Sequence, residues 1–387
     1  MRAVDNLTVH RPGSTGVPWY IWSCVLAITC SGVGIIWDIS WHKSIGRDSF
    51  LTPPHVLVYL SGILAGLSSG YVILSTTFGR DPDTRAAAAK MWGFRGPLGA
   101  FLCAWGGVAM IASAPFDNWW HNAYGLDVKI LSPPHMVLTL GMIAIRFGTL
   151  LFILGQLNRA SGRTKTILSG LLLYSFMSLM GISLGAFQEL TVRPYMHSAQ
   201  FYFVVCATVP LWLATIGAAS SSRWACTIVA ALYTVYFISF IWILPLFPAE
   251  PKLGPVYHSV TRFVPPDFPL LLIAPAFAVD LLRRRFSTWP AGRKAVVTGA
   301  LFLAVFVTVQ WLFADFLQSP TARNWAFGTQ YFPYFIPSDS PYVRYLFVPL
   351  EHSASEFWRR MAFALVAAVV MTRIGLAWGA GMRKLQR

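Results

Sequence analysis

One arrangement of side chains that can bind a metal ion occurs twice in this chain of 387 residues. The two copies are Asp38-x3-His42-x12-His55 and Asp117-x3-His121-x13-His135. Two residues four positions apart on a helix project from one face, with their Cβ atoms about 5–6 Å apart. The last histidine of each copy follows a Pro-Pro pair, and proline is favoured at the first position of a helix. We therefore expect each copy to join the end of one helix to the start of the next.

One carboxylate and two imidazoles suit copper, non-haem iron or zinc, and they leave coordination positions open. Ionisable groups at a membrane border are costly, so their repetition favours a site. The alternatives are a structural polar network that links the two hairpins, or a proton or ion path.

Other polar residues in the same two loops are expected to support the ligands. Asp48 and Asp127 can accept a hydrogen bond from a ligating histidine, and Arg47 can pair with Asp48. Glu189 and His197 form a weaker metal candidate, for which an ordinary loop surface is the favoured interpretation.

The composition is that of a membrane protein, because 56% of the residues are hydrophobic and only 12% are charged. A soluble domain carries about 25% charged residues. Since a span needs roughly 20 apolar residues, we predict an all-α polytopic bundle of about ten transmembrane helices, arranged as five hairpins. The predicted spans are 18–37, 54–78, 97–116, 135–157, 166–187, 199–219, 224–247, 268–282, 295–317 and 358–380.

The loops alternate between basic and mixed composition. Eighteen Lys and Arg residues fall in one set of loops and in the termini, against about ten in the opposite set. The positive-inside rule then places both termini in the cytoplasm and the two metal motifs on the exoplasmic side, in a bacterial cytoplasmic membrane. The net charge of +15 does not indicate a nucleic-acid partner, because the basic residues lie in short loops between apolar runs.

The chain is predicted to have three parts: a cytoplasmic tail (1–17), a four-helix metal-binding repeat (18–157) and a six-helix membrane region of unknown role (158–387). Four charged residues fall near or inside predicted spans. Asp280 and Asp315 lie near helix ends and are expected to reach water. Arg146 and Arg373 lie deeper in the membrane and are expected to have buried partners.

At these motifs the chain resembles the C subunit of the copper membrane monooxygenases, the group that contains particulate methane and ammonia monooxygenases. That subunit has an Asp-x3-His-x12-His copper site. Its arginine–aspartate pair and Thr-Pro-x-His return resemble Arg47-Asp48 and the segment 52–55 here. It also has a second site with x3 and x13 spacing, in which asparagine stands where this chain has Asp117. The resemblance covers about residues 18–157, and the family's cupredoxin-like domains have no counterpart in this chain.

The resemblance implies a membrane-bound, copper-dependent oxidase or monooxygenase, with iron as an alternative metal. It would use O2 to oxidise a C–H or N–H bond of a small substrate. Its electrons would come from a quinol or a partner protein, and it would work in the lipid bilayer alone or as a homo- or hetero-oligomer. Two alternatives use the same Asp and His residues: a transporter or metal-handling protein, and a non-catalytic metal-binding subunit of a membrane complex.

Overall fold

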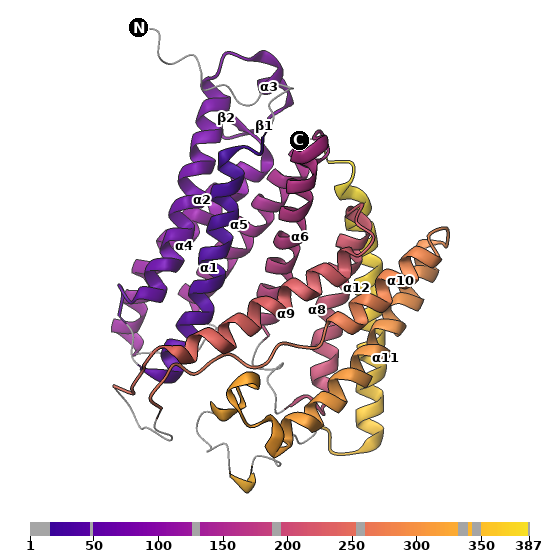
Figure 1. Ribbon diagram of the computed structural model, residues 1–387. Helices are drawn as coiled ribbons and strands as arrows, with labels where there is room; N and C mark the ends of the chain where they lie inside the picture. The colour runs from indigo at the N-terminus through magenta and orange to yellow at the C-terminus, as the bar shows by residue number, and fades with distance from the viewer. Residues whose placement is uncertain are drawn as a thin grey trace. The chain divides into compact units, whose positions relative to one another are not determined.

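The computed structural model describes residues 16–46, 49–125, 132–187, 195–252, 260–331, 340–342 and 350–385 (Figure 1). In these residues the chain is an all-α membrane protein, which confirms the predicted fold class, and nine helices are long and apolar enough to cross a membrane. The long helices are α1 (Trp19–Ser44), α2 (Pro53–Phe78), α4 (Leu98–Tyr124), α5 (Pro133–Leu157), α6 (Gly162–Gly185), α8 (Ala199–Ala219), α9 (Ala225–Ile243), α11 (Ala291–Gln318) and α12 (Ala354–Met382). The shorter elements are α3 (Pro82–Ala87), β1 (Ala89–Met91), β2 (Phe94–Gly96), α10 (Ile273–Arg285) and the 3-10 turns η2 (Leu244–Leu246), η3 (Pro320–Ala322), η4 (Trp325–Phe327) and η5 (Thr329–Tyr331).

The chain forms two compact units. The first comprises Met1–Ile35, Ser49–Leu179 and Lys384–Arg387, and the second comprises Ile36–Asp48 and Met180–Arg383. The first unit therefore holds most of α1 and of α6 together with α2, α4 and α5. The second holds the last turns of α1 and of α6 together with α8 to α12.

Glycines bring α4 and α5 close together in the first unit. A Cβ atom built on Gly106 would lie 2.6 Å from the carbonyl oxygen of Gly141, and one on Gly99 would lie 2.6 Å from that of Gly148. Small residues permit this close approach of backbones, which is how membrane helices pack without a hydrophobic driving force. The two helices of the hairpin that carries the second metal motif, α4 and α5, are therefore packed closely at several points along their length.

Two helices continue beyond the ends that the apolar runs predicted. α1 ends at Ser44 instead of residue 37, and α4 ends at Tyr124 instead of residue 116. Hydropathy marks where the apolar stretch stops, whereas a helix continues for as long as its backbone hydrogen bonds are satisfied. The extra turns carry the first two polar residues of each metal motif on one helical face.

The eighth predicted span differs from the structure. α10 begins at Ile273 and has only 13 residues, about 20 Å of helix, whereas the hydrocarbon core of a bilayer is about 30 Å thick. The preceding residues, 260–272, are not helical and include three prolines, which lack the backbone N–H that a helix interior needs.

Buried side chains satisfy the backbone of this non-helical segment within the second unit. Ser40 donates to the Val264 carbonyl at 2.6 Å, the Val264 N–H donates to Ser44 at 2.7 Å, and the Leu271 N–H donates to Gln310 at 2.9 Å. Non-helical backbone is tolerated at membrane depth only where protein groups satisfy it. A non-helical segment followed by the short helix α10 therefore stands where the sequence predicted one continuous helix.

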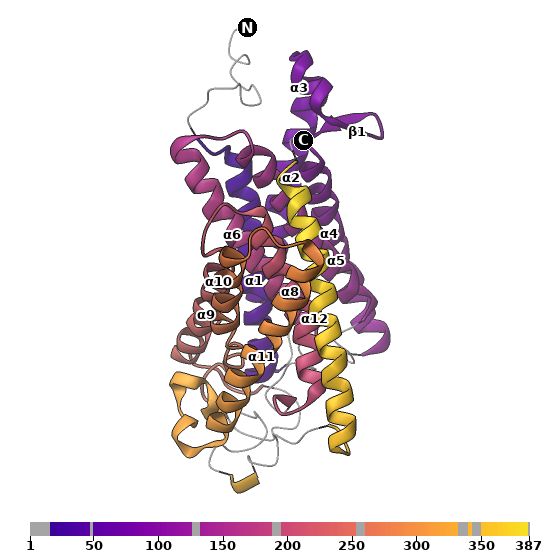
Figure 2. The same cartoon turned by 90° about the vertical axis from the view of Figure 1, so that its right-hand side faces the viewer.

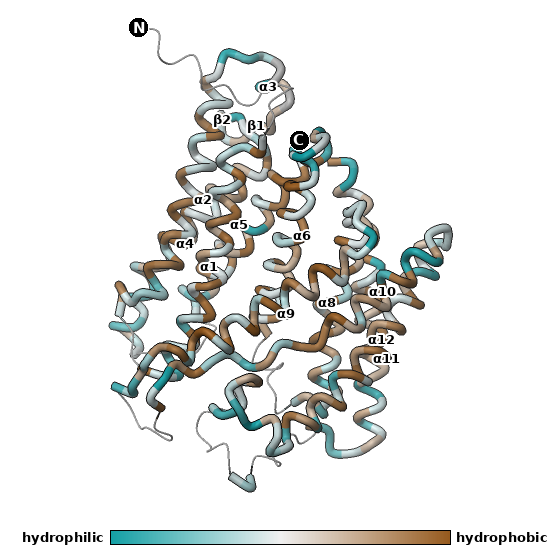
Figure 3. Tube along the Cα trace, in the orientation of Figure 1, coloured by the Kyte–Doolittle hydropathy of each residue, from teal (hydrophilic) through white to brown (hydrophobic). Residues whose placement is uncertain are grey.

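The rest of the second unit is built on the pairing of α8 with α12, which run side by side (Figure 2). A Cβ atom on Gly375 or Gly379 of α12 would meet backbone carbonyls of α8, so these two helices also approach closely. Hydrophobic residues follow the lengths of the long helices, whereas the last turns of α10 are hydrophilic (Figure 3).

Candidate metal centres

The second motif forms a compact three-ligand cluster within the first unit. Asp117 and His121 lie one turn apart near the end of α4, and the Oδ2 of Asp117 is 3.3 Å from the Nε2 of His121. His135 lies in the first turn of α5, and its Nε2 is 3.5 Å from the Oδ1 of Asp117. One carboxylate therefore faces two imidazoles, and the three ligand atoms lie within 4.8 Å of one another.

The local sequence explains why these three side chains meet. Pro133 and Pro134 start α5, and the side chain of Ser132 accepts a hydrogen bond from the His135 N–H as the N-cap. Gly125 ends α4 with a φ of +95° and donates its N–H to the His121 carbonyl. Only glycine adopts such a φ without strain.

A backbone carbonyl orients the His121 ring. Its Nδ1 lies 3.2 Å from the carbonyl oxygen of Gly125. With the proton on Nδ1, the ring donates to that carbonyl and turns the Nε2 lone pair toward Asp117. Second contacts of this kind select the tautomer of a metal-binding histidine and hold its ring.

The cluster has the dimensions of an open metal site. In a tetrahedral site with ligand bonds of about 2.1 Å, ligand atoms lie about 3.4 Å apart. Here the Nε2 atoms of His121 and His135 lie 3.3 and 3.5 Å from the two different oxygens of Asp117, and one ligand atom from each residue lies within 4.8 Å of the other two. The exposed fractions of the Asp117, His121 and His135 side chains are 23%, 17% and 32%. The ligands are thus accessible to an ion and leave room for a further ligand.

The first motif shares part of this local design, although its N-cap residue Thr52 makes no side-chain cap hydrogen bond. On α1 the Nε2 of His42 lies 3.7 Å from the Oδ2 of Asp38, and the helix is followed by Gly46 with a φ of +94°. In α2 the Nδ1 of His55 lies 3.1 Å from the carbonyl oxygen of Ser49, which leaves its Nε2 as the ligand atom. Asp38 and His42 belong to the second unit and His55 to the first, so their joining at one ion stays a prediction.

The remaining predicted site residues lie elsewhere. Arg47, Asp48, Asp127 and Glu189 lie outside the described residues, so their supporting roles stay predictions. His197 lies in the second unit, where its Nε2 is 3.1 Å from the Oδ1 of Asp315 at the end of α11.

The sequence analysis did not predict the partner of His197 or the burial of Asp280. Asp315 is 57% exposed, as expected, but it pairs with a histidine 118 positions earlier in the chain. Asp280 was expected to reach water, and this expectation is wrong because the residue is fully buried.

The two membrane arginines also differ. Arg146 is buried and donates to Ser178, as predicted. Arg373 is exposed on the surface of α12, and the expectation of a buried partner is wrong. Whether such an arginine is buried or exposed depends on the face of the helix from which it projects. A hydropathy average over a window of residues does not distinguish the faces.

No protein-family model matches the chain, and no curated protein or solved structure matches it. The resemblance to the monooxygenase C subunit therefore rests on the two motifs alone. What the structure adds is the presence of Asp and His groups able to bind a metal in a membrane-helical protein.

Proposed function

We propose that this membrane protein holds a redox-active metal ion at Asp117, His121 and His135 and uses it to oxidise a small substrate with O2. The observation that carries the proposal is the meeting of one carboxylate with two imidazole Nε2 atoms, at 3.3 and 3.5 Å, at the end of a helical hairpin. The repeated motif extends the proposal to a second ion at Asp38, His42 and His55.

Copper is the proposed metal, with iron and zinc as the alternatives that the ligand set permits. Three protein ligands leave coordination positions for O2 or water, which a closed structural site does not offer. A copper or iron ion at such a site supplies the one-electron chemistry that O2 requires, whereas zinc has no redox chemistry. Inserting one oxygen atom into a C–H or N–H bond and reducing the other to water consumes two electrons and two protons. A quinol or a partner protein is the proposed donor.

The chain's own residues have distinct roles in this proposal. Asp117 supplies the charge that holds the ion, and His121 and His135 supply neutral nitrogen ligands. The Gly125 carbonyl keeps His121 in the correct tautomer. Aromatic side chains surround the end of α4, with Trp120 and Tyr124 at 4.4 Å between ring centroids. Trp119 is 54% exposed, as is common for tryptophan at a membrane interface.

The experiment starts with protein purified in detergent without chelator. Bound metals are measured in the unchanged chain and in the His121→Ala and His135→Ala variants. His352→Ala is the matched control, because His352 is an exposed histidine outside the repeat. We expect both site variants to lose metal and the control to keep it. Unchanged metal content in the site variants would refute the ligand assignment.

Oxygen uptake with a reductant and candidate substrates then tests the chemistry. Substrate-dependent uptake that disappears in His121→Ala supports an oxidase or monooxygenase. If metal binds but no reductant and substrate give uptake, the centre is structural and the chain is a non-catalytic metal-binding subunit.

A transporter is the second candidate, and the broken crossing at residues 260–285 favours it. Transporters commonly place discontinuous helices at their binding sites. Gradient-driven metal flux in proteoliposomes, without oxygen uptake, would support this function. The cluster that carries the oxidase proposal, Asp117, His121 and His135, belongs to the first unit, whereas the break before α10 belongs to the second, which is why we rank the transporter second.

A further inference from the structure

A short β-hairpin, formed by β1 and β2, connects the helices α2 and α4 of the first unit. In its register Lys90 lies opposite Arg95, and Met91 lies opposite Phe94. Successive side chains of a strand point to opposite faces, so the two cations share one face and the two apolar side chains share the other. The hairpin projects to the side of α2 (Figure 2). It is therefore an amphipathic element at the end of a membrane helix.

Contacts with α2 fix the position of this hairpin. The Thr77 hydroxyl accepts a hydrogen bond from the Arg95 N–H at 2.8 Å and lies 3.1 Å from the Arg95 carbonyl oxygen. A Cβ atom built on Gly96 would lie 3.2 Å from the Ile73 side chain, so the backbone of β2 packs directly on α2. An isolated two-stranded hairpin is marginally stable in water. The helix therefore supplies the support that holds the hairpin in place.

The turn of the hairpin carries a residue that the turn itself disfavours. Trp92 and Gly93 are its two central residues, with φ angles of +49° and +87°. Two positive φ angles are typical of a type I′ turn, which prefers Asn, Asp or Gly at these positions. Among the described residues, Trp92 is the one non-glycine residue with a positive φ. Backbone strain of this kind clusters at functional positions, so the Trp92 side chain is a candidate for a role outside the turn.

The Trp92 ring lies beside a membrane span. It contacts the Trp105 ring edge-on, at 4.7 Å between ring centroids. Trp105 is seven positions beyond the start of α4 at Leu98, about 10 Å along the helix. Trp92 is 73% exposed, and Trp105 and Phe94 are also exposed. Exposed tryptophan near the end of a span is typical of the membrane interface, so the tip of the hairpin lies along the bilayer border.

The other face of the hairpin favours a negatively charged ligand. Residues directly opposite in an antiparallel pair have their Cβ atoms about 4.5–5.5 Å apart, and like charges there are destabilising. Lys90 and Arg95 form such a pair. The exposed Arg85 adds a third cation, and its carbonyl accepts from the Arg95 side chain at 2.9 Å. An anion between Lys90 and Arg95 would relieve their repulsion.

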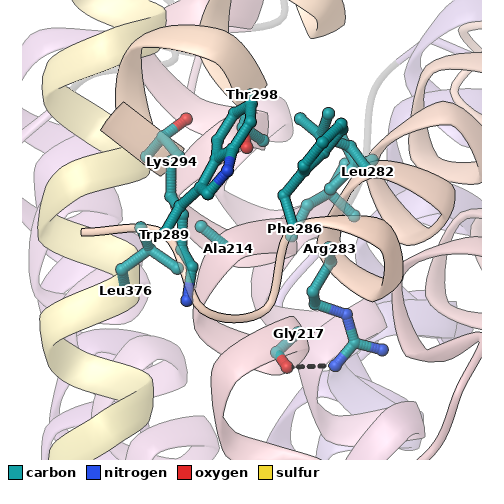
Figure 4. Close-up of a pocket in the computed structure, with 12 residues that line it drawn as sticks. Ala214, Gly217, Leu282, Arg283, Phe286, Trp289, Lys294, Thr298 and Leu376 are labelled. Atoms are coloured by element: carbon teal, nitrogen blue, oxygen red, sulfur yellow. Dashed lines mark hydrogen bonds between the residues drawn. The ribbon is translucent and has the colours of Figure 1, made fainter. Parts of the chain in front are cut away.

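The basic last turn of α10 shows the contrasting case. Arg283 donates to the carbonyl of Gly217 (Figure 4) and to that of Ser222, and it pairs with the buried Asp280. The charge of Arg283 is therefore used within the protein. Lys90 instead lies exposed on a strand, directly opposite a second cation.

We propose that the hairpin 89–96 is an interfacial anchor for anionic phospholipid. In this proposal Trp92 and Phe94 lie among the upper acyl chains, and a lipid phosphate lies at Lys90 and Arg95. Amphipathic elements that lie in a membrane interface combine an aromatic apolar face with Lys and Arg on the polar face. The positive-inside rule predicts that this end of α2 is cytoplasmic, and the cytoplasmic leaflet is the anionic one. The anchor uses none of the proposed metal ligands.

Photo-cross-linking of the full chain in nanodiscs tests the proposal. The nanodiscs contain equal amounts of phosphatidylcholine and phosphatidylglycerol, and one of the two lipids carries a photoreactive group at the top of an acyl chain. Mass spectrometry measures the cross-linked fraction of the hairpin peptide. We expect phosphatidylglycerol to label it at least about fivefold more than phosphatidylcholine, the preference that one cation near the membrane surface supplies. Inorganic phosphate should not reduce this labelling.

Two variants separate the roles of the charges and of the ring. Lys90→Gln combined with Arg95→Gln should make the two lipids label the hairpin equally. Trp92→Asn suits the type I′ turn better and should lower labelling by both lipids at least about threefold, because no ring enters the acyl region. Both variants remove a local conflict, so they should elute as folded protein. The matched control is Arg163→Gln, which removes an exposed cation from the start of α6 and should leave the labelling unchanged.

Four outcomes would overturn the proposal. Equal labelling of the unchanged chain by the two lipids would indicate a contact without charge selectivity. A preference for phosphatidylglycerol that survives the double substitution would remove Lys90 and Arg95 from the site. Unchanged labelling of Trp92→Asn would show that the ring does not enter the membrane, and loss of the preference in inorganic phosphate would indicate a simple anion site.

Discussion

Two aspartates near the ends of helices, Asp117 and Asp280, have opposite environments. The protein satisfies the carboxylate of Asp280 completely: the Thr227 N–H donates at 2.8 Å, the Thr227 hydroxyl at 2.9 Å, and Arg283 pairs with it at 3.3 Å. Among the described residues, Asp117 instead meets the imidazoles of two histidines.

The difference separates a structural carboxylate from a candidate ligand. A buried charge needs a pairing cation and hydrogen-bond donors, and Asp280 has both. A metal ion shared by Asp117, His121 and His135 would supply the positive charge that Arg283 supplies to Asp280. Burial alone would have favoured Asp280 as the functional residue, whereas the chemistry of the neighbours favours Asp117.

The largest expected effect is on metal content, when each of the two aspartates is replaced by alanine in turn. Asp117→Ala should remove the metal bound at the second centre, a loss greater than the 10–100-fold that changes around a ligand cost. Asp280→Ala should keep that metal. Metal content per chain after gel filtration measures both variants, and metal loss from Asp280→Ala alone would reverse the assignment.

The second effect is on the free energy of unfolding, and here replacing Asp280 should cost more than replacing Asp117. Asp280→Ala leaves Arg283 without its carboxylate and the Thr227 N–H without its acceptor, so we expect a cost of about 3 kcal/mol. Asp117→Ala should change the stability of the metal-free protein by less than about 1 kcal/mol, since its side chain is partly exposed. Thermal unfolding in detergent with chelator compares the two, and equal losses would remove the distinction.

A milder change at Asp117 tests the role of its charge. Asp117→Asn keeps an oxygen ligand and produces the residue type found in the second site of the monooxygenase C subunit that this chain resembles. We expect metal affinity to fall about tenfold, or about 1.4 kcal/mol, with both histidines still bound. Competition with a calibrated chelator gives the affinity, and complete loss of metal would show that the charge is essential.

The smallest effect concerns the turn that holds His121. Gly125→Ala places a side chain at a φ of +95°, which costs about 1 kcal/mol or more, and loosens the carbonyl that orients the ring. The matched control is Gly170→Ala, because a Cβ atom at Gly170 meets nothing within 4 Å and alanine favours the helix. Thermal unfolding should show a loss at Gly125 and a small gain at Gly170.

The sequence predicted local features well. Both Asp-x3-His pairs lie on one helical face, both Pro-Pro-His segments start helices, and the glycines at 46 and 125 have φ angles of +94° and +95°. These features depend on residues fewer than about 20 positions apart, where spacing and propensity are sufficient.

Long-range pairing could not be predicted in the same way. Nothing near His197 in the sequence indicates Asp315, and nothing near Asp280 indicates Thr227. The break before α10 had a signal in its prolines, but hydropathy averaged over a window concealed it. Which face a helix buries depends on its neighbours, and these come from distant parts of the chain.

The most direct test of the central claim is X-ray absorption spectroscopy of the metal-loaded His42→Ala variant, which leaves the second centre as the one intact motif. We predict a first shell of two imidazole nitrogens and one carboxylate oxygen at about 2.0–2.2 Å, with any remaining ligands from solvent. A spectrum without imidazole scattering, or a sulfur shell at about 2.3 Å, would contradict a shared ion at Asp117, His121 and His135.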